Sequence, residues 1–287
     1  MTPYFFLLPA LLFVFAFVIY PVGHAFVTSL YNPSVIGQKE VKFVGLANFA
    51  RLLTEPTTYS ILLNNVKYSA AVTAGTVLIG LILALLLDQE TRGWRVFRVV
   101  FYLPVVLAAV LVAKLWMAFY EPHFGLFNQT LKMLGLSSWT RIWLGDGTIA
   151  LACIIAISIW QYSGYTMVFF LAALQNIPAE LMEAARIDGV KSIFGIARHI
   201  KIPLILPVIT IVVMLQIIGT FKIYDIIWAT TKGGPGTSSS VLSILLYKEA
   251  FMRNAFGYAE AVAVFMFLII FLISLGYLGI ARFGKEE

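Results

Sequence analysis

The chain has 287 residues, of which 61% are hydrophobic and only 12% are charged, whereas a soluble domain is closer to half apolar and a quarter charged. A mean hydropathy of +0.92 argues against a soluble enzyme or nucleic-acid-binding protein, because one water-soluble core of this size cannot bury so much apolar surface. The net charge of +6 is therefore interpreted as a sign of orientation in a membrane. A single cysteine, Cys153, excludes an intrachain disulfide and a cysteine-based zinc site.

Six apolar segments are long enough to cross a bilayer, which needs roughly 20 mostly apolar residues. We therefore predict an all-α, polytopic membrane protein with one domain over residues 1–287. The first segment has no basic residues before it and exceeds the apolar part of a signal peptide, so we expect it to remain as a span. The expected spans are residues 4–31, 68–87, 99–120, 149–175, 202–229 and 261–281.

The positions of Lys and Arg predict the orientation. The connections after the second, fourth and sixth spans carry nine Lys or Arg residues in about 44 positions, and the other connections carry nine in about twice that length. The denser set, close to the span ends, is expected in the cytoplasm. Because six spans are an even number, both termini are expected on the cytoplasmic side of the cell membrane.

The expected outer connections contain turn-forming and interfacial residues. A short helix from Ala47 to Leu53 can lie on the membrane, and Trp139 and Trp143 suit the membrane–water interface. Residues 232–240 form a cluster rich in Gly and Ser that ends the fifth span. Such a cluster is also typical of a passive, flexible connection.

The connection between the fourth and fifth spans predicts a helix, a sharp turn and a second short helix; we call residues 177–203 the elbow. Pro178 suits the first helical position, and Glu180 and Glu183 lie in the first turns, where the helix dipole favours carboxylates. Gly189 can end this helix, and Ser192 can cap the next. A projecting elbow fits a groove on a partner, although a hairpin that only caps the bundle fits the same topology.

The elbow resembles a known motif. The run Glu183-Ala184-Ala185-Arg186-Ile187-Asp188-Gly189, followed by Ile202-Pro203 and Pro207, resembles the EAA loop of binding-protein-dependent ABC importer permeases. Three further segments are similar to sugar permeases of this family, and the chain lacks the Gly-rich tail of the second permease of each pair. These segments are residues 43–49, 102–104 and 221–235.

The resemblance implies a type I, MalF-like permease fold and the MalF/UgpA-like subunit of a carbohydrate importer. The expected solute is a sugar, an oligosaccharide or a glycerol-phosphate-like compound, delivered by an extracytoplasmic solute-binding protein. The other expected partners are a second, MalG-like permease in a heterodimer, two ATPase subunits and membrane lipid, with no nucleic acid. The chain is not expected to be an enzyme, and it has no phosphate-binding loop, so ATP and Mg²⁺ are expected in the ATPase and no cofactor here.

The resemblance assigns two sets of contact residues outside the membrane. In this family the EAA loop inserts into a cleft of the ATPase subunit, and the outer loops face the binding protein. The coupling residues are Glu183, Ala184, Ala185, Asp188 and Gly189, and the binding-protein contacts are Gly233, Gly234, Pro235 and Thr237.

Polar and aromatic residues predict a solute path through the fourth and fifth spans, because such residues face a cavity more cheaply than lipid. Spacings of three, four and seven residues place the fourth-span set on one helix face. On the fifth span the candidates are Thr220, Lys222, Tyr224 and Asp225. The resemblance supports the fourth-span set and implies three contacts near the end of the fifth span, of which it shares only Thr220 with these candidates. The path residues are Ser158, Gln161, Tyr162, Tyr165, Gly219, Thr220 and Ile223.

Other interpretations remain open. The polar residues of the fourth span could instead hold helices together, and Lys222 and Asp225 could form an ion pair at the outer interface. A secondary transporter or channel without an ATPase is the alternative function, and a membrane scaffold is a third. The three histidines are far apart in sequence, which disfavours a metal site, and Ser163 has no histidine in its span to activate it.

Overall fold

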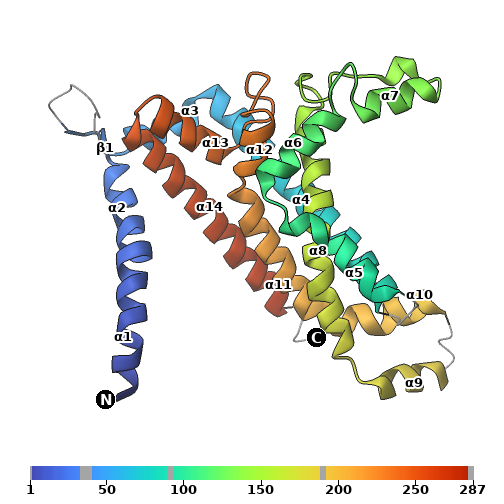
Figure 1. The fold of residues 1–287 in the computed structure, drawn as a ribbon. Coiled ribbons are helices and arrows are strands. Elements are labelled where there is room, and N and C mark those ends of the chain that lie inside the picture. Colours follow the sequence, from blue (N-terminus) through green and yellow to red (C-terminus); the bar gives the residue numbers. More distant parts are fainter. Residues whose placement is uncertain (1, 33–40, 89–92, 188–191, 284–287) are drawn as a thin grey trace.

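The computed structural model of the protein describes residues 2–32, 41–88, 93–187 and 192–283, and it is helical over most of them (Figure 1). Within these residues the only sheet is a short antiparallel pair in which Tyr31 lies opposite Phe43. The all-α prediction is confirmed. The elements up to the middle of the chain are α1 (Thr2–Val14), the π-helix η1 (Phe15–Ile19), α2 (Tyr20–Thr28), β1 (Tyr31–Asn32), β2 (Lys42–Phe43), α3 (Ala47–Thr54), α4 (Pro56–Leu87), α5 (Trp94–Val106), α6 (Ala109–Phe119), α7 (Leu126–Met133) and the 3₁₀-helix η2 (Ser137–Trp139).

The second half of the chain is also built from helices. It contains two long helices that cross the molecule, α8 and α14, and a third, α11, that is preceded by a π-helical turn. The elements are α8 (Ala150–Gln175), α9 (Ala179–Ile187), α10 (Ile193–Ile196), the π-helix η3 (Ala197–Lys201), α11 (Ile202–Phe221), α12 (Asp225–Thr230), α13 (Leu242–Tyr247), the π-helix η4 (Lys248–Met252) and α14 (Phe256–Phe283).

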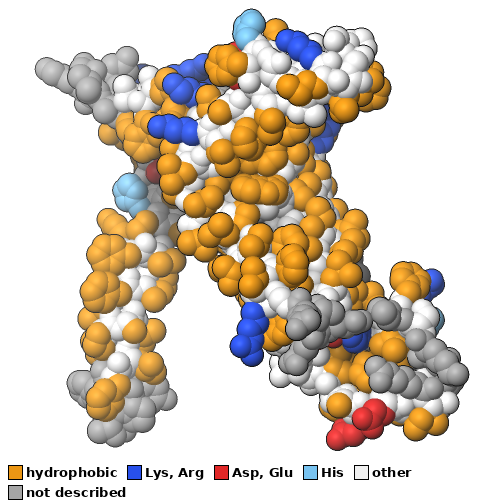
Figure 2. All heavy atoms as spheres, turned by 45° about the vertical axis from the view of Figure 1, so that its right-hand side comes forward, with side chains coloured by type: hydrophobic (Ala, Val, Ile, Leu, Met, Phe, Trp, Pro, Cys, Tyr) orange, Lys and Arg blue, Asp and Glu red, His pale blue; other side chains and the backbone are white. Residues whose placement is uncertain are grey.

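Among the described residues, five helices are long and apolar enough to cross a membrane, and a sixth crossing results if α5 and α6 are counted as one broken span. Figure 2 shows hydrophobic side chains over the middle of the visible face, with most charged side chains towards its two ends. Five of the six predicted spans are thus present as single helices, and the third corresponds to the bent pair α5 and α6, although several bounds differ. The five helices are Phe6–Thr28, Pro56–Leu87, Ala150–Gln175, Phe194–Phe221 and Phe256–Tyr277.

The third predicted span, residues 99–120, is not one straight helix. It starts earlier, at Trp94, and breaks between α5 and α6, which meet at an angle of 97°. Leu107 and Ala108 at the break have extended backbone, with ψ of 135° and 137°. Pro104 lies inside α5, three residues before the break, and its ring removes one hydrogen bond from the turn that precedes it.

The second and fifth predicted spans also differ from the structure. The second helix begins at Pro56 rather than at residue 68, because Asn64 and Asn65 find partners outside their own helix. The fifth predicted span, residues 202–229, is divided at Lys222, after which Asp225 begins the separate helix α12. A carboxylate in the first turn favours such a helix start.

The chain ends and the connecting loops lie at two opposite ends of the molecule (Figure 1). α1 begins, and α14 ends, on the side of α9 and α10, which we call the elbow end. The strand pair, α3, α7 and α13 lie on the opposite side, which we call the loop end. The arrangement has the even number of crossings that the sequence predicts.

The core of the bundle is the contact between α4 and α8, which neighbouring helices extend. A Cβ atom at Gly80 of α4 would lie 2.0 Å from the Thr166 hydroxyl oxygen of α8. At Gly164 of α8 it would lie 2.1 Å from the Phe101 carbonyl oxygen of α5. Only glycine permits these approaches, so the two positions determine how closely α4, α8 and α5 pack.

The first helix contributes little to this core. None of the most apolar window of Phe6–Thr28 is buried, and α1 stands apart from the other helices (Figure 1). Its second half, α2, contacts α14, where the rings of Phe26 and Phe267 meet edge-on at 6.0 Å. The chain therefore leaves α1 exposed to whatever surrounds it in the membrane.

Candidate functional site

The elbow projects from one end of the bundle. Its first helix, α9, follows Pro178, whose carbonyl accepts a hydrogen bond from the Leu181 amide at 3.2 Å. On α9 Glu183 and Ala184 are exposed, whereas Ala185 is buried. Ala185 therefore packs within this chain, whereas Glu183 and Ala184 are open to a partner.

The second arm of the elbow partly follows the prediction. Ser192 caps it as expected, since its hydroxyl accepts a hydrogen bond from the Gly195 amide at 3.0 Å. The prediction of a separate short helix is wrong, because α10 continues through η3 into α11 as one helix from Phe194 to Phe221. Asp188 and Gly189, the predicted turn, lie outside the described residues.

Two of the path residues predicted on α8 are buried in helix contacts. The Ser158 hydroxyl accepts a hydrogen bond from the Tyr68 hydroxyl of α4 at 2.7 Å and donates one to the Ile154 carbonyl at 2.9 Å. The Gln161 amide donates to the Leu107 carbonyl at the break of the third span, at 3.3 Å. The Gln161 side-chain oxygen is buried and has no hydrogen-bond partner among the residues that the structure describes. The geometry gives Ser158 the helix-contact role that the sequence left open.

The other predicted residues on α8 are more accessible. Tyr162 and Tyr165 are half-buried, and the Tyr165 ring packs edge-on against Phe169 with ring centroids 4.9 Å apart. The fourth-span set therefore divides into a buried pair, Ser158 and Gln161, and a pair of tyrosines that reach the surface of this chain.

The residues predicted at the end of α11 divide in the same way. The buried Thr220 hydroxyl is 2.7 Å from the Ser69 hydroxyl of α4. Gly219 is exposed, and a Cβ atom there would have open space around it. Ile223 is half-buried. The side chains of Lys222 and Asp225 are exposed and do not pair, so the structure contradicts the ion pair considered for them.

The sequence did not lead us to predict a row of polar contacts that Tyr68, Ser69 and Thr76 of α4 make with α8 and α11. We call this row the polar seam. The Thr166 hydroxyl of α8 donates to the Thr76 carbonyl at 2.6 Å, and the Gln216 amide of α11 donates to the Thr76 hydroxyl at 3.0 Å. With Tyr68 and Ser69, these contacts join α4 to both neighbours. The signal was present, since the polar residues Ser69, Thr73 and Thr76 recur at helical spacing within an apolar segment.

The loop that follows α12 is ordered rather than flexible. The Asn64 amide of α4 donates hydrogen bonds to three of its carbonyls, those of Thr237, Ser238 and Ser240, at 3.0–3.2 Å. The Asn65 carbonyl oxygen accepts one from the Leu242 amide at 2.9 Å. The loop is therefore not a flexible connection, whereas its contact with a binding protein stays a prediction.

The predicted contact residues of this loop differ in exposure. Gly233 is buried and Gly234 and Thr237 are half-buried, whereas Pro235 is exposed together with its neighbour Gly236. We call Pro235 and Gly236 the loop tip. Because Asn64 forms hydrogen bonds with the rest of the loop, the loop tip has a fixed position at the loop end.

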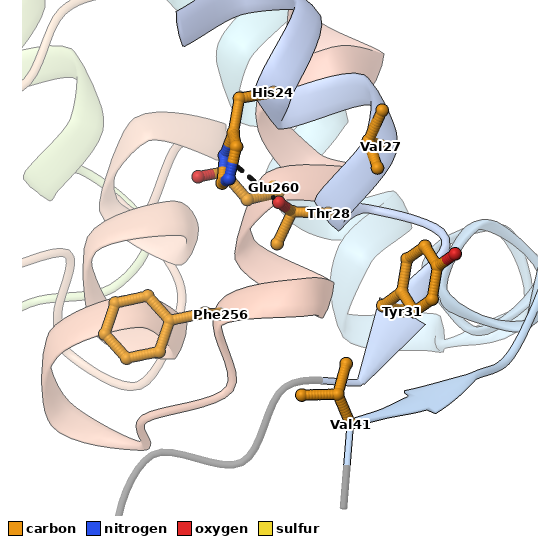
Figure 3. Close-up of a pocket in the computed structure, with 7 residues that line it drawn as sticks. All are labelled: His24, Val27, Thr28, Tyr31, Val41, Phe256 and Glu260. Atoms are coloured by element: carbon orange, nitrogen blue, oxygen red, sulfur yellow. Dashed lines mark hydrogen bonds between the residues drawn. The ribbon is translucent and has the colours of Figure 1, made fainter.

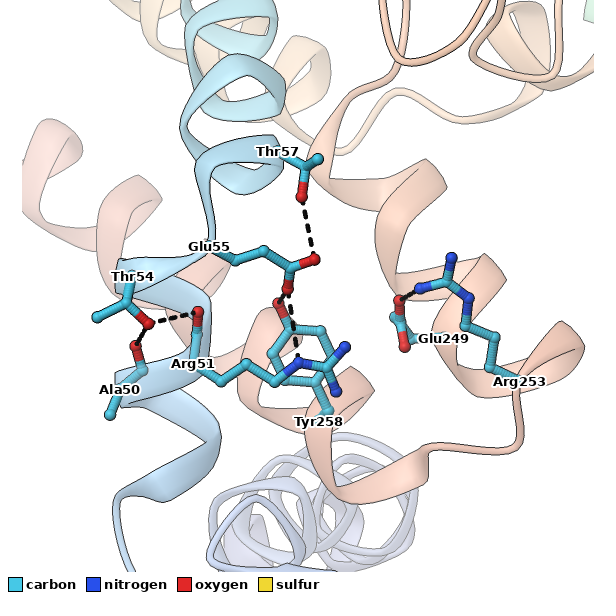
Figure 4. A network of polar contacts seen from close by, with 8 residues as sticks. All are labelled: Ala50, Arg51, Thr54, Glu55, Thr57, Glu249, Arg253 and Tyr258. Carbon is cyan, nitrogen blue, oxygen red and sulfur yellow. Dashed lines mark hydrogen bonds and ion pairs between the residues drawn. The ribbon is translucent and has the colours of Figure 1, made fainter.

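A polar network joins α3 and the start of α4 to α14 at the loop end (Figure 4). The Arg51 guanidinium lies 4.1 Å from the centre of the Tyr258 ring, and its Nε is 3.5 Å from the Glu55 carboxylate. The Tyr258 hydroxyl donates to the same carboxylate at 3.4 Å. Close by, the buried carboxylate of Glu249 pairs with Arg253. These contacts position the loop end relative to α14.

A cavity of about 580 Å³ lies between α2 and α14 near this network (Figure 3). Glu260 and His24 point toward one another within it, and the His24 ring nitrogen is 3.2 Å from the Thr28 hydroxyl. The remaining lining is mainly apolar. Over the described parts of the chain, no group of His, Cys, Asp or Glu could hold a metal ion, so the cavity offers no metal centre.

The family assignment rests on a comparison with family models. Residues 76–282 match the family described as "Binding-protein-dependent transport system inner membrane component". The chain belongs to this family. The permease is therefore a multi-pass membrane component of a transport system that depends on a binding protein. Nothing in the comparisons favours a secondary transporter or channel.

Relatives and a solved structure agree with this assignment. The permease is 39% identical to a probable ABC transporter permease protein, YurN of Bacillus subtilis, over 99% of this chain and 97% of the relative. It is 31% identical to the trehalose/maltose transport system permease protein MalF of Thermococcus litoralis, over 99% and 94%. A crystal structure of a bacterial alginate ABC transporter in complex with an alginate pentasaccharide-bound periplasmic protein contains a similar chain. The TM-score is 0.86 at 21% identity, with 98% of this chain and 94% of that chain covered; this likeness supports the ABC permease fold.

Proposed function

We propose that this permease is one membrane subunit of an ATP-driven importer that takes up a carbohydrate. The observation that carries the proposal is the elbow of a binding-protein-dependent permease, on which Glu183 and Ala184 are free while Ala185 anchors α9 to its own chain. An exposed carboxylate on a projecting helix suits docking into a groove of an ATPase subunit. Relatives named for trehalose/maltose transport support a saccharide as the solute.

The proposed partners follow from where the free surfaces lie. Two ATPase subunits dock at the elbow end, a second permease completes a heterodimer, and a solute-binding protein docks at the loop end around the loop tip. Gly233, Gly234, Pro235 and Thr237 remain the proposed contacts, with exposed Pro235 as the foremost of them. The elbow end then faces the cytoplasm.

The proposed solute path runs along the accessible side of α8 and the end of α11. Tyr162, Tyr165, Gly219 and Ile223 reach the surface of this chain, where a second permease can close a path between the two subunits. The tyrosine rings offer apolar faces to a sugar ring, and their hydroxyls offer hydrogen bonds. Buried Ser158, Gln161 and Thr220 contribute to such a path if the helices separate there.

Co-purification and transport test the proposal. The tagged permease should bring down an ATPase subunit and a second permease. The complex in proteoliposomes, supplied with its binding protein, should take up a saccharide only when ATP is present on the elbow side. Uptake that is independent of ATP by the isolated permease would overturn the proposal.

A further inference from the structure

The elbow is attached to the bundle by an ion pair as well as by its own chain. The Nζ atom of Lys201, the last residue of η3, lies 2.5 Å from the Oδ2 atom of Asp88, which caps the C-terminus of α4. The two side chains are only 16% and 14% exposed. They are 113 residues apart in the sequence, so the pair closes a long loop of chain.

The surroundings of the pair make it costly to separate. Both residues lie beside an apolar cluster formed by the end of α4, the start of α5, the end of α8 and the start of α11. Removing one partner of such a shielded pair leaves an uncompensated charge, which costs more than the pair itself contributes. The cluster includes Leu87, Trp94, Leu174, Ile177 and Ile205.

α4 carries this attachment to the other end of the molecule. Asp88 lies at its elbow end, and Asn64 holds the outer loop near its loop end. The 24 residues between them correspond to about 36 Å of continuous helix at 1.5 Å per residue. Along this length the polar seam joins α4 to α8 and α11.

We propose that Asp88 and Lys201 are positioning residues that make α4 move with the elbow, so that α4 transmits ATPase-driven motion toward the loop tip. The inference rests on the proposed function, since it needs an ATPase at the elbow. A single helix bonded at one end to the elbow and at the other to the outer loop is a rigid element of the kind that carries coupling between distant sites.

Distances between spin labels test the inference in the complete complex with its co-purified ATPase. The natural thiol is removed by Cys153→Ala, and labels are placed at Phe194 and Leu86, which are 74% and 65% exposed. A second pair, Phe194 and Leu272, reports elbow motion relative to α14. Each pair is measured without nucleotide and with ATP and vanadate.

In the protein with the ion pair intact, nucleotide should change the distance between Phe194 and Leu272 but leave the distance between Phe194 and Leu86 unchanged. Asp88→Asn and Lys201→Met should each make the Phe194–Leu86 distance change or broaden on nucleotide binding, and the charge exchange Asp88→Lys with Lys201→Asp should keep it constant again. The matched control is Arg198→Met, which removes an exposed charge from the same π-helical turn.

Two outcomes have different meanings. If nucleotide leaves the Phe194–Leu86 distance unchanged in the single variants, or already changes it in the original protein, the proposed role of the ion pair is wrong. The proposed function stands in both cases. If no ATPase co-purifies, or nucleotide leaves the Phe194–Leu272 distance unchanged, the proposed function fails and the inference fails with it. Thermal unfolding of every variant shows whether a changed distance reflects partial unfolding instead, and a single variant that is partly unfolded counts against a role in positioning.

Discussion

Gly164 shows how a single residue determines how closely two helices, α8 and α5, pack. Because a Cβ atom there would lie 2.1 Å from the Phe101 carbonyl oxygen, Gly164→Ala must push α5 away from α8. We expect a loss of roughly 1–3 kcal/mol in the free energy of unfolding, the usual cost of overpacking. The readout is thermal unfolding followed by a thiol-reactive dye, since Cys153 is buried and reacts only on opening.

Gly23→Ala is the matched control for this substitution, because a Cβ atom at Gly23 would meet nothing within 4 Å. Its unfolding midpoint should stay close to that of the original protein. Equal midpoints for Gly164→Ala and Gly23→Ala would show that α5 can retreat from α8 without cost.

Glu183 is the residue at which the docking assignment can be tested. It is exposed on α9 and has no partner within the described part of its own chain, so Glu183→Lys should leave folding unchanged. We expect the variant to enter the membrane normally but to lose ATPase co-purification or ATP-driven uptake, because the charge presented to the partner is reversed. Lys at the exposed neighbour Glu180 is the control for a general charge effect. Normal uptake by Glu183→Lys would refute docking through this carboxylate.

The residue types predicted that certain polar side chains are important more reliably than they predicted the role of each side chain. Ser158 and Thr220 belong to a polar face that the sequence predicts, yet both are fully engaged between helices. A hydroxyl that hydrogen-bonds a solute and one that joins two helices have the same sequence signature. The partner, here Tyr68 or Ser69, comes from a distant segment and cannot be identified from local spacing.

At the scale of elements, the break in the third span gives Gln161 a second interpretation. Its amide satisfies the Leu107 carbonyl left without a helical partner. Gln161→Leu should therefore lower the free energy of unfolding by about 1 kcal/mol, the typical net value of such a hydrogen bond. If Gln161 contacts solute instead, uptake should fall while stability stays unchanged.

Uptake and thermal unfolding measured on the same variants distinguish the two roles. Tyr165→Ala serves for comparison, because Tyr165 is half-buried and lies on the accessible side of α8. We expect Tyr165→Ala to reduce uptake with little loss of stability. If neither measurement changes in Gln161→Leu, both interpretations of this residue are wrong.

Asn64 determines the conformation of a loop that belongs to another element. Asn64→Ala removes three hydrogen bonds to the outer loop, so the loop tip should lose its fixed position. We expect faster proteolytic cleavage within residues 232–240 and weaker association with the binding protein. Thr57→Ala, at an exposed position on the same helix, should change neither. Unchanged cleavage in Asn64→Ala would show that the loop holds its conformation without this residue.

The existence of each membrane crossing was easier to predict than its ends. Long apolar runs predicted every crossing, because a bilayer demands a minimum length of apolar helix. The start of α4 at Pro56 and the continuation of α10 into α11 were not predicted, because charged and polar residues there suggested loops. Asn64, Asn65 and Lys201 lie in helices because partners elsewhere in the chain form hydrogen bonds with their side chains: the partners of Asn64 and Lys201 accept, and the partner of Asn65 donates.

For the whole molecule, the arrangement of the ends leads to a prediction about orientation. Basic residues near the elbow end should keep it in the cytoplasm. Green fluorescent protein fused to the C-terminus should therefore fluoresce, and alkaline phosphatase fused there should be inactive. A phosphatase fusion after Gly145, at the loop end, is the control and should be active. The reverse pattern would place the elbow outside and exclude an ATPase docked there. The basic residues are Arg95, Arg98, Arg198 and Lys201.

The polar seam of α4 also has a consequence for the synthesis of the chain. Ser69 bonds with Thr220, which is made 151 residues later; at roughly 5–20 residues per second, the ribosome needs about 8–30 s to reach it. Until then the middle of α4 lies in lipid without its later partners. The Thr76 hydroxyl can donate a hydrogen bond to the Val72 carbonyl of its own helix, at 2.7 Å. This bond lowers the free-energy cost of placing the hydroxyl in lipid before its partners arrive. The unfinished chain is therefore most open to insertion chaperones and membrane proteases in the interval before α8 and α11 enter the bilayer.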